Sequence, residues 1–473
     1  MAPSTAARKT PWAMACGLLC LLAAYALCMN LFRPFDRDEL EAVHTAWKIL
    51  HGEVIYVDFA QHHHPLLYVC LAPVIGLLGE RATTVIACRI AMLPFFCGII
   101  AATWLLALRL FDKRTALVAV ACLLLSWPLL CTATEIRPDV PEAMLGMFAL
   151  VLLYPPSTGQ AAEPPKQRPI GNLPGGRCLL IGLCLGLSFL FLQKAVFYVA
   201  AVTLIFLVRI FRRESGWKDL FTLGGGFMMA ILPLGAWLIA RGMLRDYFFW
   251  NWTVNACFRD RFSFLLLAKL VLKKQPVICV FGLLGFVDLS LQRRHRRLAA
   301  IVVVTFGTVL FARCPYLQYW MPVLPLLAIY AAHGMVRTLG SRPALLWGVL
   351  AASAAAMAIT EPLWPGGTTN ARQLEQIDYV LQVAGPADAV YDGCAAFNVF
   401  RPDVDYFWFS LSDNGLLGTC RELGHYDFNV YDRIDTMKPK VVNTYGIENL
   451  GDARIHDHYE ASQSYPALLL RTR

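Results

Sequence analysis

The stretch TVIACRIAMLPFFCGIIAATWLLAL, residues 84–108, decides the fold of this chain. It is apolar almost throughout and exceeds the roughly 20 helical residues that cross the hydrocarbon core of a bilayer. Similar stretches recur as far as residue 360, so the sequence predicts a polytopic α-helical membrane protein. We place about eleven spans, at 13–32, 84–108, 115–133, 141–154, 178–193, 195–210, 220–240, 276–291, 298–312, 319–336 and 343–360.

The composition agrees with this fold class. Hydrophobic residues make up 57% and charged residues 16% of the 473 positions, whereas soluble domains average about 45–50% and about 25%. These values exclude soluble and disordered proteins. The net charge of +9 does not indicate nucleic acid, because Lys and Arg gather in the cytoplasmic loops of membrane proteins. We therefore expect membrane lipid as a partner and no nucleic acid.

Basic clusters indicate how the spans are oriented. With eleven spans and a cytoplasmic N-terminus, all of them fall on the cytoplasmic side. Two shorter apolar runs, 65–79 and 262–272, would reverse this agreement if either one spanned, so we predict that both lie in the outer interface as helices. The clusters are Arg8/Lys9, Arg109/Lys113/Arg114, Lys166/Arg168/Arg177, Arg209/Arg212/Arg213/Lys218, Arg293/Arg294/Arg296/Arg297 and Arg337/Arg342.

Two regions are then external to the membrane. The first is loop 33–83, which belongs to the membrane domain that we place at 1–360. The second is the tail 361–473, which has no apolar run of span length. An amphipathic helix at 373–381 and strands at 387–391 and 440–443 predict a small extracytoplasmic α/β domain in the tail. Two cysteines of the tail either pair as a disulfide or stay free, because spacing does not decide connectivity. They are Cys394 and Cys420.

The external loop carries the strongest candidate for chemistry. Residues 38–50 have a helical apolar pattern, which places Asp38 at the N-terminal end, where the helix dipole favours a negative charge. An ionised carboxylate in that place can accept a proton from an attacking hydroxyl. The alternative is that Asp38 only caps the helix and faces solvent.

A second group of charges lies at the outer ends of predicted spans. The short loop 134–139 holds Arg137, whose planar guanidinium suits a phosphate. An ion pair between Arg137 and Asp139, with Asp139 as the cap of the next helix, is also expected and is compatible with that role. Lys194 ends the span 178–193 and either binds a phosphate or snorkels to the interface. Arg313 opens the span 319–336 from outside and is a further anion-binding candidate.

The run His62-His63-His64 raises the question of a metal. Consecutive side chains cannot all point at one ion, and the spacing matches no zinc motif. We expect instead that a histidine, His62 or His63, helps to place a carboxylate or phosphate. Metal binding stays undecided, and a divalent cation is the one candidate cofactor.

These motifs resemble a known family. Asp38-Glu39, the segment 46–52, the segment 56–59 and the segment 62–68 together resemble the first external loop of GT-C glycosyltransferases. The nearer resemblance is to the bacterial branch related to protein O-mannosyltransferases and lipid A aminoarabinose transferases. Two shorter motifs agree with it, Arg137-Pro138-Asp139 in the second loop and Pro322-Val323-Leu324-Pro325-Leu326-Leu327 in a late span.

The resemblance implies an inverting glycosyltransferase of the bacterial inner membrane. Such enzymes move a sugar from a polyprenyl-phosphate carrier to a glycan, lipid or protein acceptor on the outer face. By the family pattern Asp38 is the base, and Glu39 supports it or contacts the sugar. Asp36 is also in the loop, so the choice of Asp38 depends on its place beside Glu39. The expected substrate-binding residues are Arg137, Asp139, Lys194, His62, His63, Asp58 and Arg313.

Two other functions fit the sequence less well. A transporter or flippase of a lipid-linked sugar would need polar sites near the membrane midplane, whereas the candidate residues gather at the outer face. A scaffold protein whose external domain binds a glycan would leave Asp38 replaceable.

Overall fold

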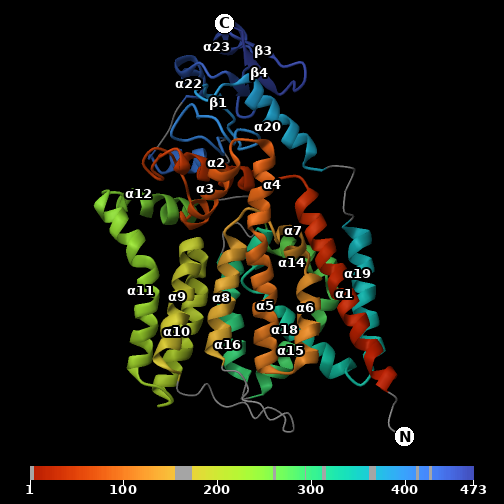
Figure 1. Ribbon diagram of the computed structural model, residues 1–473. Helices are drawn as coiled ribbons and strands as arrows, with labels where there is room; N and C mark the ends of the chain where they lie inside the picture. Colours follow the sequence, from red (N-terminus) through yellow and green to blue (C-terminus); the bar gives the residue numbers. More distant parts are fainter. Residues whose placement is uncertain are drawn as a thin grey trace.

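The computed structural model describes residues 5–154, 173–258, 263–292, 295–311, 316–361, 369–411, 415–425 and 429–472, with side chains from residue 15 onward. Arg313 lies outside these residues. Long helices form a lower layer, and short helices, loops and a small sheet cover its upper end (Figure 1). The lower layer contains α1 (Thr5–Phe32), α5 (Leu93–Leu110), α6 (Lys113–Leu124), α8 (Asp139–Leu153), α9 (Gly175–Phe191), α10 (Val196–Phe211), α11 (Trp217–Ala240), α15 (Pro276–Leu291), α16 (Arg296–Thr305), α18 (Leu324–Leu339) and α19 (Pro343–Thr360).

Several of these helices can cross a membrane. Among the described residues, five helical segments are long and apolar enough to span, and α14 (Phe264–Lys274) with α15 passes as a pair bent by 101°. One of the five is the decisive stretch, which α4 (Ala82–Ala91) and α5 form together. The chain is therefore a multi-pass membrane protein, while the count of eleven spans stays a prediction.

Predicted single spans are interrupted where proline follows. The span 84–108 breaks at Met92, two residues before Pro94, and the span 115–133 breaks before α7 (Trp127–Thr132), which has Pro128 in its first turn. A proline lacks the backbone N–H that would continue the helix and disfavours helical geometry in the residue before it. The span 298–312 is also divided, into α16 and α17 (Gly307–Leu310), but this break at Phe306 has no proline beside it. Helix α18 follows a 3-10 turn (Leu317–Trp320).

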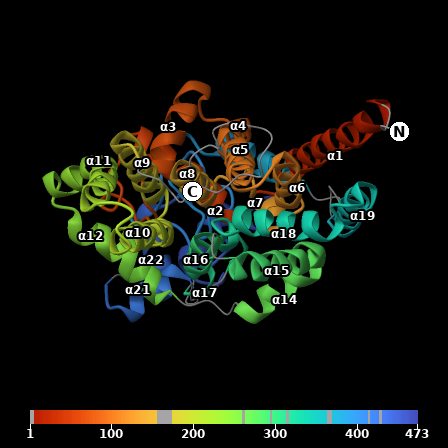
Figure 2. The ribbon, with the colours of Figure 1, turned by 90° about the horizontal axis from the view of Figure 1, so that it is seen from below.

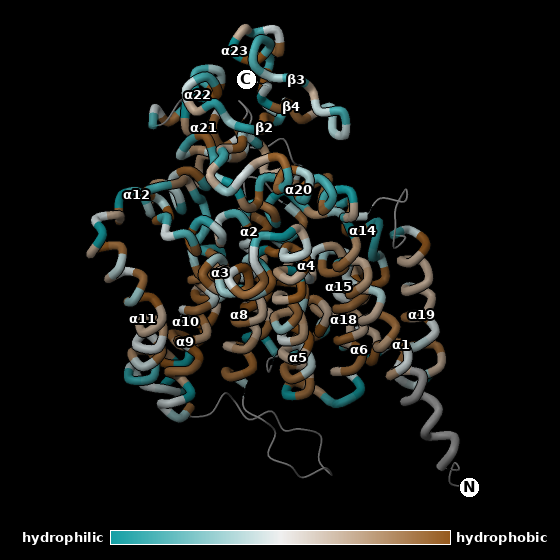
Figure 3. Tube along the Cα trace, turned by 45° about the horizontal axis from the view of Figure 1, so that its top comes forward, coloured by the Kyte–Doolittle hydropathy of each residue, from teal (hydrophilic) through white to brown (hydrophobic). Residues whose placement is uncertain are grey.

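The two ends of the bundle differ in charge. The turns α5–α6, α10–α11, α15–α16 and α18–α19 lie at the lower end, opposite the sheet (Figure 1). These turns carry predicted basic clusters, and Arg109 and Arg177 also donate to the Tyr154 carbonyl at the end of α8, at 2.7 and 3.0 Å. In Figure 3 hydrophilic segments occupy these lower turns and also cover the upper end, around α2 and α20.

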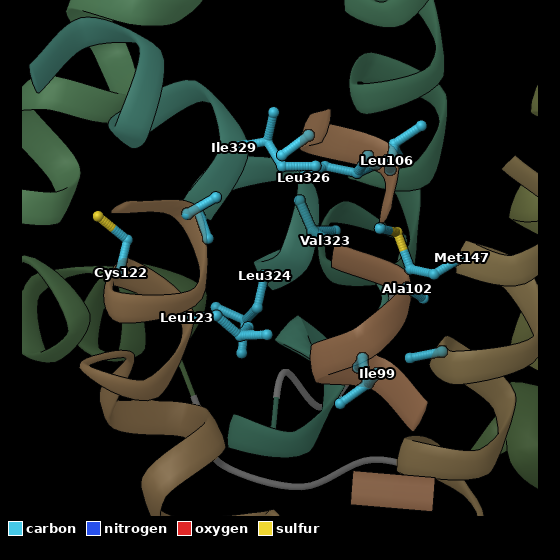
Figure 4. Close-up of a cluster of buried hydrophobic side chains, with 14 of the residues drawn as sticks. Ile99, Ala102, Leu106, Cys122, Leu123, Met147, Val323, Leu324, Leu326 and Ile329 are labelled. Carbon is cyan, nitrogen blue, oxygen red and sulfur yellow. The ribbon is translucent and has the colours of Figure 1, made fainter. Parts of the chain in front are cut away.

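The core of the lower layer is built by helices that neighbour one another in the bundle. Seen from below, α9, α10 and α11 lie on one side and α1 and α19 on the other, with α8, α5, α6 and α18 between them (Figure 2). Figure 4 shows fully buried side chains of α5, α6, α8 and α18 in contact, among them Ile99, Leu123, Met147 and Ile329. This apolar core fixes the helix ends that carry the polar residues above it.

The upper layer joins the external loop to the tail. Loop 33–83 forms α2 (Arg37–Leu50) and α3 (Leu66–Leu78), and the tail forms α20 (Ala371–Val383), α21 (Leu416–Glu422), α22 (Val430–Met437) and α23 (Ala453–His456). The sheet has the order β1-β2-β4-β3, with β1 (Val390–Tyr391) parallel to β2 (Val441–Asn443) and β4 (Leu468–Arg471) antiparallel to both β2 and β3 (Tyr459–Ala461). One buried apolar cluster contains residues of both regions, so loop and tail share a core.

The predicted elements of the tail are present, although shorter or longer than expected. The helix 373–381 lies within α20, and the strands 387–391 and 440–443 contain β1 and β2. The disulfide alternative is wrong, because Cys394 and Cys420 are both buried free thiols. Between the lower and upper layers lie α12 (Leu244–Phe248), a π-helical turn (Phe249–Val254) and α13 (Asn255–Cys257).

Candidate active site

Arg137 lies at the centre of a cluster of charges, in the turn between α7 and α8. Its guanidinium pairs with Asp38 and lies 3.1 Å from Asp36. Its Nε lies 3.8 Å from a carboxylate oxygen of both Glu135 and Asp139. Four carboxylates from two segments about 100 residues apart in sequence therefore converge on one guanidinium at the upper end of the helices.

The start of α2 explains how Asp38 reaches this cluster. Asp36 is the N-cap, and its side chain accepts a hydrogen bond from the Asp38 N–H at 3.1 Å. The alternative that Asp38 caps the helix is therefore wrong, and Asp38 stands in the first turn with its side chain 45% exposed. Its carboxylate is free to meet a substrate beside Arg137.

The start of α8 brings two more predicted residues together. The helix begins at Asp139, and Pro138 occupies the cap position, so the expectation that Asp139 is the cap is wrong. Lys194 stands in a 3-10 turn (Gln193–Ala195) between α9 and α10, with its ammonium 3.5 Å from Asp139 and 3.0 Å from the centre of the Tyr319 ring. Arg137, Asp139 and Lys194 thus form one continuous group.

Glu39 points in a different direction. Its carboxylate is fully buried and binds Arg89 through two contacts, 2.6 Å from Nε and 2.8 Å from Nη2. Arg33 is the second partner of this carboxylate, at 3.3 Å. Arg89 also donates to the carbonyls of Asn30 and Pro34 at the end of α1. Glu39 therefore ties α2 to α1 and α4 in this structure.

Glu41 faces the same side of α2 as Asp38, one turn later. Its carboxylate accepts a hydrogen bond from Gln61 Nε2 at 3.0 Å and lies 3.8 Å from His62 Nδ1. Burial raises the pKa of Glu41 well above its usual range, and the charge of Asp38 adds to the effect. Glu41 therefore holds its proton to a higher pH than an exposed glutamate does.

The three histidines divide into two roles. Burial lowers the pKa of His62 to about 4, against the opposing charge of Asp38, and it lowers that of His63 well below its usual range. Both rings are therefore neutral near pH 7, and the Nδ1 atoms of both are buried without a hydrogen-bond partner among the described residues. His64 instead joins the loop to the bundle, through Phe189 O at 2.6 Å and the Tyr247 hydroxyl at 3.0 Å.

One predicted site residue lies apart from this group. Asp58 is exposed and accepts a hydrogen bond from the Val54 N–H at 2.7 Å, which closes the turn before the histidines. The described contacts of Asp58 include none with Arg137 or Lys194.

The structure adds residues that sequence reasoning left out. Burial raises the pKa of Glu135 to about 7, although Arg33 and Arg137 oppose this shift. Glu142 is fully buried one turn after Asp139, and both of its carboxylate oxygens lack a partner among the described residues. Arg89 and Glu142 had a signal in the sequence, because each is an ionisable residue inside an apolar stretch, where charge is costly.

The arrangement can support transfer from a phosphate carrier. A half-exposed carboxylate can accept a proton, while Arg137 and Lys194 beside it can neutralise a phosphate. Within the described ranges, no group of three or more His, Cys, Asp or Glu side chains has the geometry of a metal site.

No family model and no curated protein matches this sequence. The fold is nevertheless the GT-C type that the motifs resemble, as comparison with solved structures shows. ArnT from Cupriavidus metallidurans bound to undecaprenyl phosphate has a TM-score of 0.66 at 12% identity, over 99% of this chain and 98% of that one. Its apo state gives 0.62 at 14% identity, over 91% and 93%.

A second protein has the same architecture at greater distance. The oligosaccharyltransferase of Archaeoglobus fulgidus, tethered with an acceptor peptide, has a TM-score of 0.51 at 12% identity, over 97% of this chain and 74% of that one. At these identities the likeness establishes the fold, and function has to be argued from the site.

Proposed function

We propose that this chain is an inverting glycosyltransferase that moves a sugar from a polyprenyl-phosphate carrier to an acceptor. The observation that carries the proposal is the pairing of Asp38 with Arg137, next to Lys194, at the upper end of the membrane layer. The solved ArnT complex contains undecaprenyl phosphate, and a solved AglB complex contains dolichol phosphate. Both support a lipid phosphate as the carrier.

The reaction assigns one role to each group. Asp38 accepts the proton of the acceptor hydroxyl as the acceptor oxygen attacks the anomeric carbon. The bond from that carbon to the carrier phosphate breaks, and Arg137 and Lys194 stabilise the phosphate that leaves. His62 and His63, being neutral, can donate to and accept from sugar hydroxyls. Asp139 holds Lys194, and Glu39 holds α2 in place.

The positions of the basic turns indicate the side of the membrane on which the site lies. The basic turns lie opposite the site, and under the positive-inside rule this supports a site and a tail on the outer face. For a bacterial chain this is the periplasmic side of the inner membrane. The acceptor is a glycan, a lipid or a protein.

A transfer assay tests the proposal. Purified protein in nanodiscs is given a panel of radiolabelled polyprenyl-phosphate sugars, with a membrane extract as the acceptor source. Label should pass to an acceptor with the wild type and with Asp58→Asn, since the hydrogen bonds that Asp58 makes among the described residues are to Val54. Binding of undecaprenyl phosphate should weaken in Arg137→Ala and Lys194→Ala. Movement of the labelled carrier across a sealed vesicle without transfer would instead show a flippase.

A further inference from the structure

Gln61 is a buried amide whose hydrogen bonds are all made inside the protein. Its Nε2 donates to Glu41 Oε1 at 3.0 Å and to Thr45 Oγ1 at 2.9 Å. Its Oε1 accepts from the N–H groups of His62 at 2.7 Å and His63 at 3.2 Å. An amide side chain offers two donors and two acceptor positions, so Gln61 has none left for a substrate.

These four bonds join two separate parts of the candidate site. Glu41 and Thr45 are one turn apart on α2, and Glu41 is one turn after Asp38. The histidine N–H groups belong to the loop that follows Gln61. The amide therefore sets the distance between the helix that carries Asp38 and the backbone that carries the two neutral rings.

The tail also forms hydrogen bonds to this loop, at the residue before Gln61. Ala60 donates its N–H to Tyr406 O at 3.0 Å, and its carbonyl accepts from Trp408 Nε1 at 3.3 Å. The Phe409 ring stacks on His62 with 5.6 Å between ring centres. Both backbone groups of Ala60 are therefore held by the tail, and the Phe409 ring covers the ring of His62.

We propose that Gln61 is a positioning residue that holds His62 and His63 in register with Asp38, with the tail segment 406–409 as its support. The ring Nδ1 atoms of the two histidines, buried and unpartnered among the described residues, are the groups so presented. This inference rests on the proposed function. It assigns Glu41 the role of a hydrogen-bond acceptor for Gln61, and it requires no negative charge at position 41.

Exchanging the two side chains tests this role. Gln61→Glu places a carboxyl against the Glu41 carboxyl, so kcat/KM for sugar transfer should fall about 10- to 100-fold, as for small misplacements of reacting groups. The loss should deepen as the pH rises, because two ionised carboxylates repel. Glu41→Gln should keep most activity, since its amide oxygen can still accept from Gln61. In the double variant Gln61→Glu/Glu41→Gln the amide at position 41 can donate to the carboxylate at position 61. This variant should therefore recover most of the lost kcat/KM.

Hydrogen–deuterium exchange supplies a readout that does not depend on transfer. The peptide containing residues 61–64 should exchange slowly in the wild type, faster in Gln61→Leu, and slowly again in the double variant. Gln373→Glu is the matched control, because Gln373 bonds both backbone groups of Phe35 and should leave this peptide unchanged. Wild-type exchange in Gln61→Leu, or a double variant that stays inactive, overturns the proposal.

The two proposals fail in different ways. In one outcome the peptide 61–64 exchanges as predicted in the wild type, Gln61→Leu and the double variant, but the wild type neither transfers sugar nor binds the carrier. This outcome refutes the glycosyltransferase proposal and leaves the positioning role of Gln61 intact. Normal transfer by Gln61→Leu refutes the positioning role and leaves the glycosyltransferase intact.

Discussion

Replacing Glu39 with glutamine should cost stability rather than remove a reacting group. The Glu39 and Arg89 side chains are both fully buried, and two contacts of 2.6 and 2.8 Å join them. In Glu39→Gln one carboxylate oxygen becomes an NH2 group, which faces an Arg89 donor and leaves its charge unbalanced. Removing one partner of a buried ion pair typically costs about 3–5 kcal/mol.

The structure shows where the loss would appear. Arg89 also donates to the carbonyls of Asn30, Arg33 and Pro34, at 2.9, 2.8 and 3.1 Å. A displaced Arg89 would therefore loosen the end of α1 as well as the start of α2. Exposed ion pairs contribute only about 0–1 kcal/mol, so Asp38→Asn, whose side chain is 45% exposed, should unfold close to the wild type.

Thermal unfolding in one detergent compares the two variants directly. We expect Glu39→Gln to lower Tm by several degrees and to keep residual transfer below that temperature, while Asp38→Asn keeps its Tm and loses transfer. A Glu39→Gln protein with the wild-type Tm and no transfer would refute this reasoning. It would then give Glu39 a direct part in the chemistry.

Three further predictions follow from buried groups. Burial lowers the pKa of His64 from 6.5 to about 4, so the unfolded chain takes up a proton at a higher pH than the folded chain does. Stability therefore falls as the pH drops from 6.5 towards 4. His64→Gln should flatten this slope when unfolding is measured at several pH values. A Cβ at Gly182 would lie 1.9 Å from Leu223 O, whereas one at Gly224 meets nothing within 4 Å, so Gly182→Ala should lower Tm and Gly224→Ala should not. Asp403→Asn weakens contacts to two buried residues of α2, Lys48 at 2.7 Å and His44 at 2.9 Å. It should therefore lower Tm and speed hydrogen exchange in α2.

Much of the fold was predictable because hydrophobicity and charge act over whole segments. The stretch 84–108 is apolar enough to identify a span whatever its partners, and the helix pattern at 38–50 agrees with α2. The interruptions were less visible, since Pro94 is compatible either with a kink or with a new helix start. Tertiary contacts decide between these two outcomes.

The site was predictable in part. Charges at the outer ends of spans share one level in the membrane, which predicts that Arg137, Asp139 and Lys194 lie close together. In the structure Asp139 links the other two, at 3.8 Å from Arg137 and 3.5 Å from Lys194. Helix geometry predicts that Asp38 and Glu39 point about 100° apart, but it does not predict which partner each carboxylate meets. Which of the two faces Arg137 depends on Arg89, a residue about 50 positions away.

The role of Gln61 could not be read from the sequence at all. An amide in a loop is ordinarily a surface residue, and nothing local indicates that it is buried between α2 and the tail. The Tyr406 and Trp408 contacts that fix the neighbouring Ala60 come from the far end of the chain.

The central claim is that Asp38 is the base, and one measurement tests it most directly. The initial rate of sugar transfer is compared between wild type and Asp38→Asn in the same nanodiscs, with binding of undecaprenyl phosphate measured on both. We predict that transfer falls about 10²- to 10⁴-fold, the usual contribution of a general base, while carrier binding persists. Transfer at the wild-type rate by Asp38→Asn would contradict the account and direct attention to Asp36.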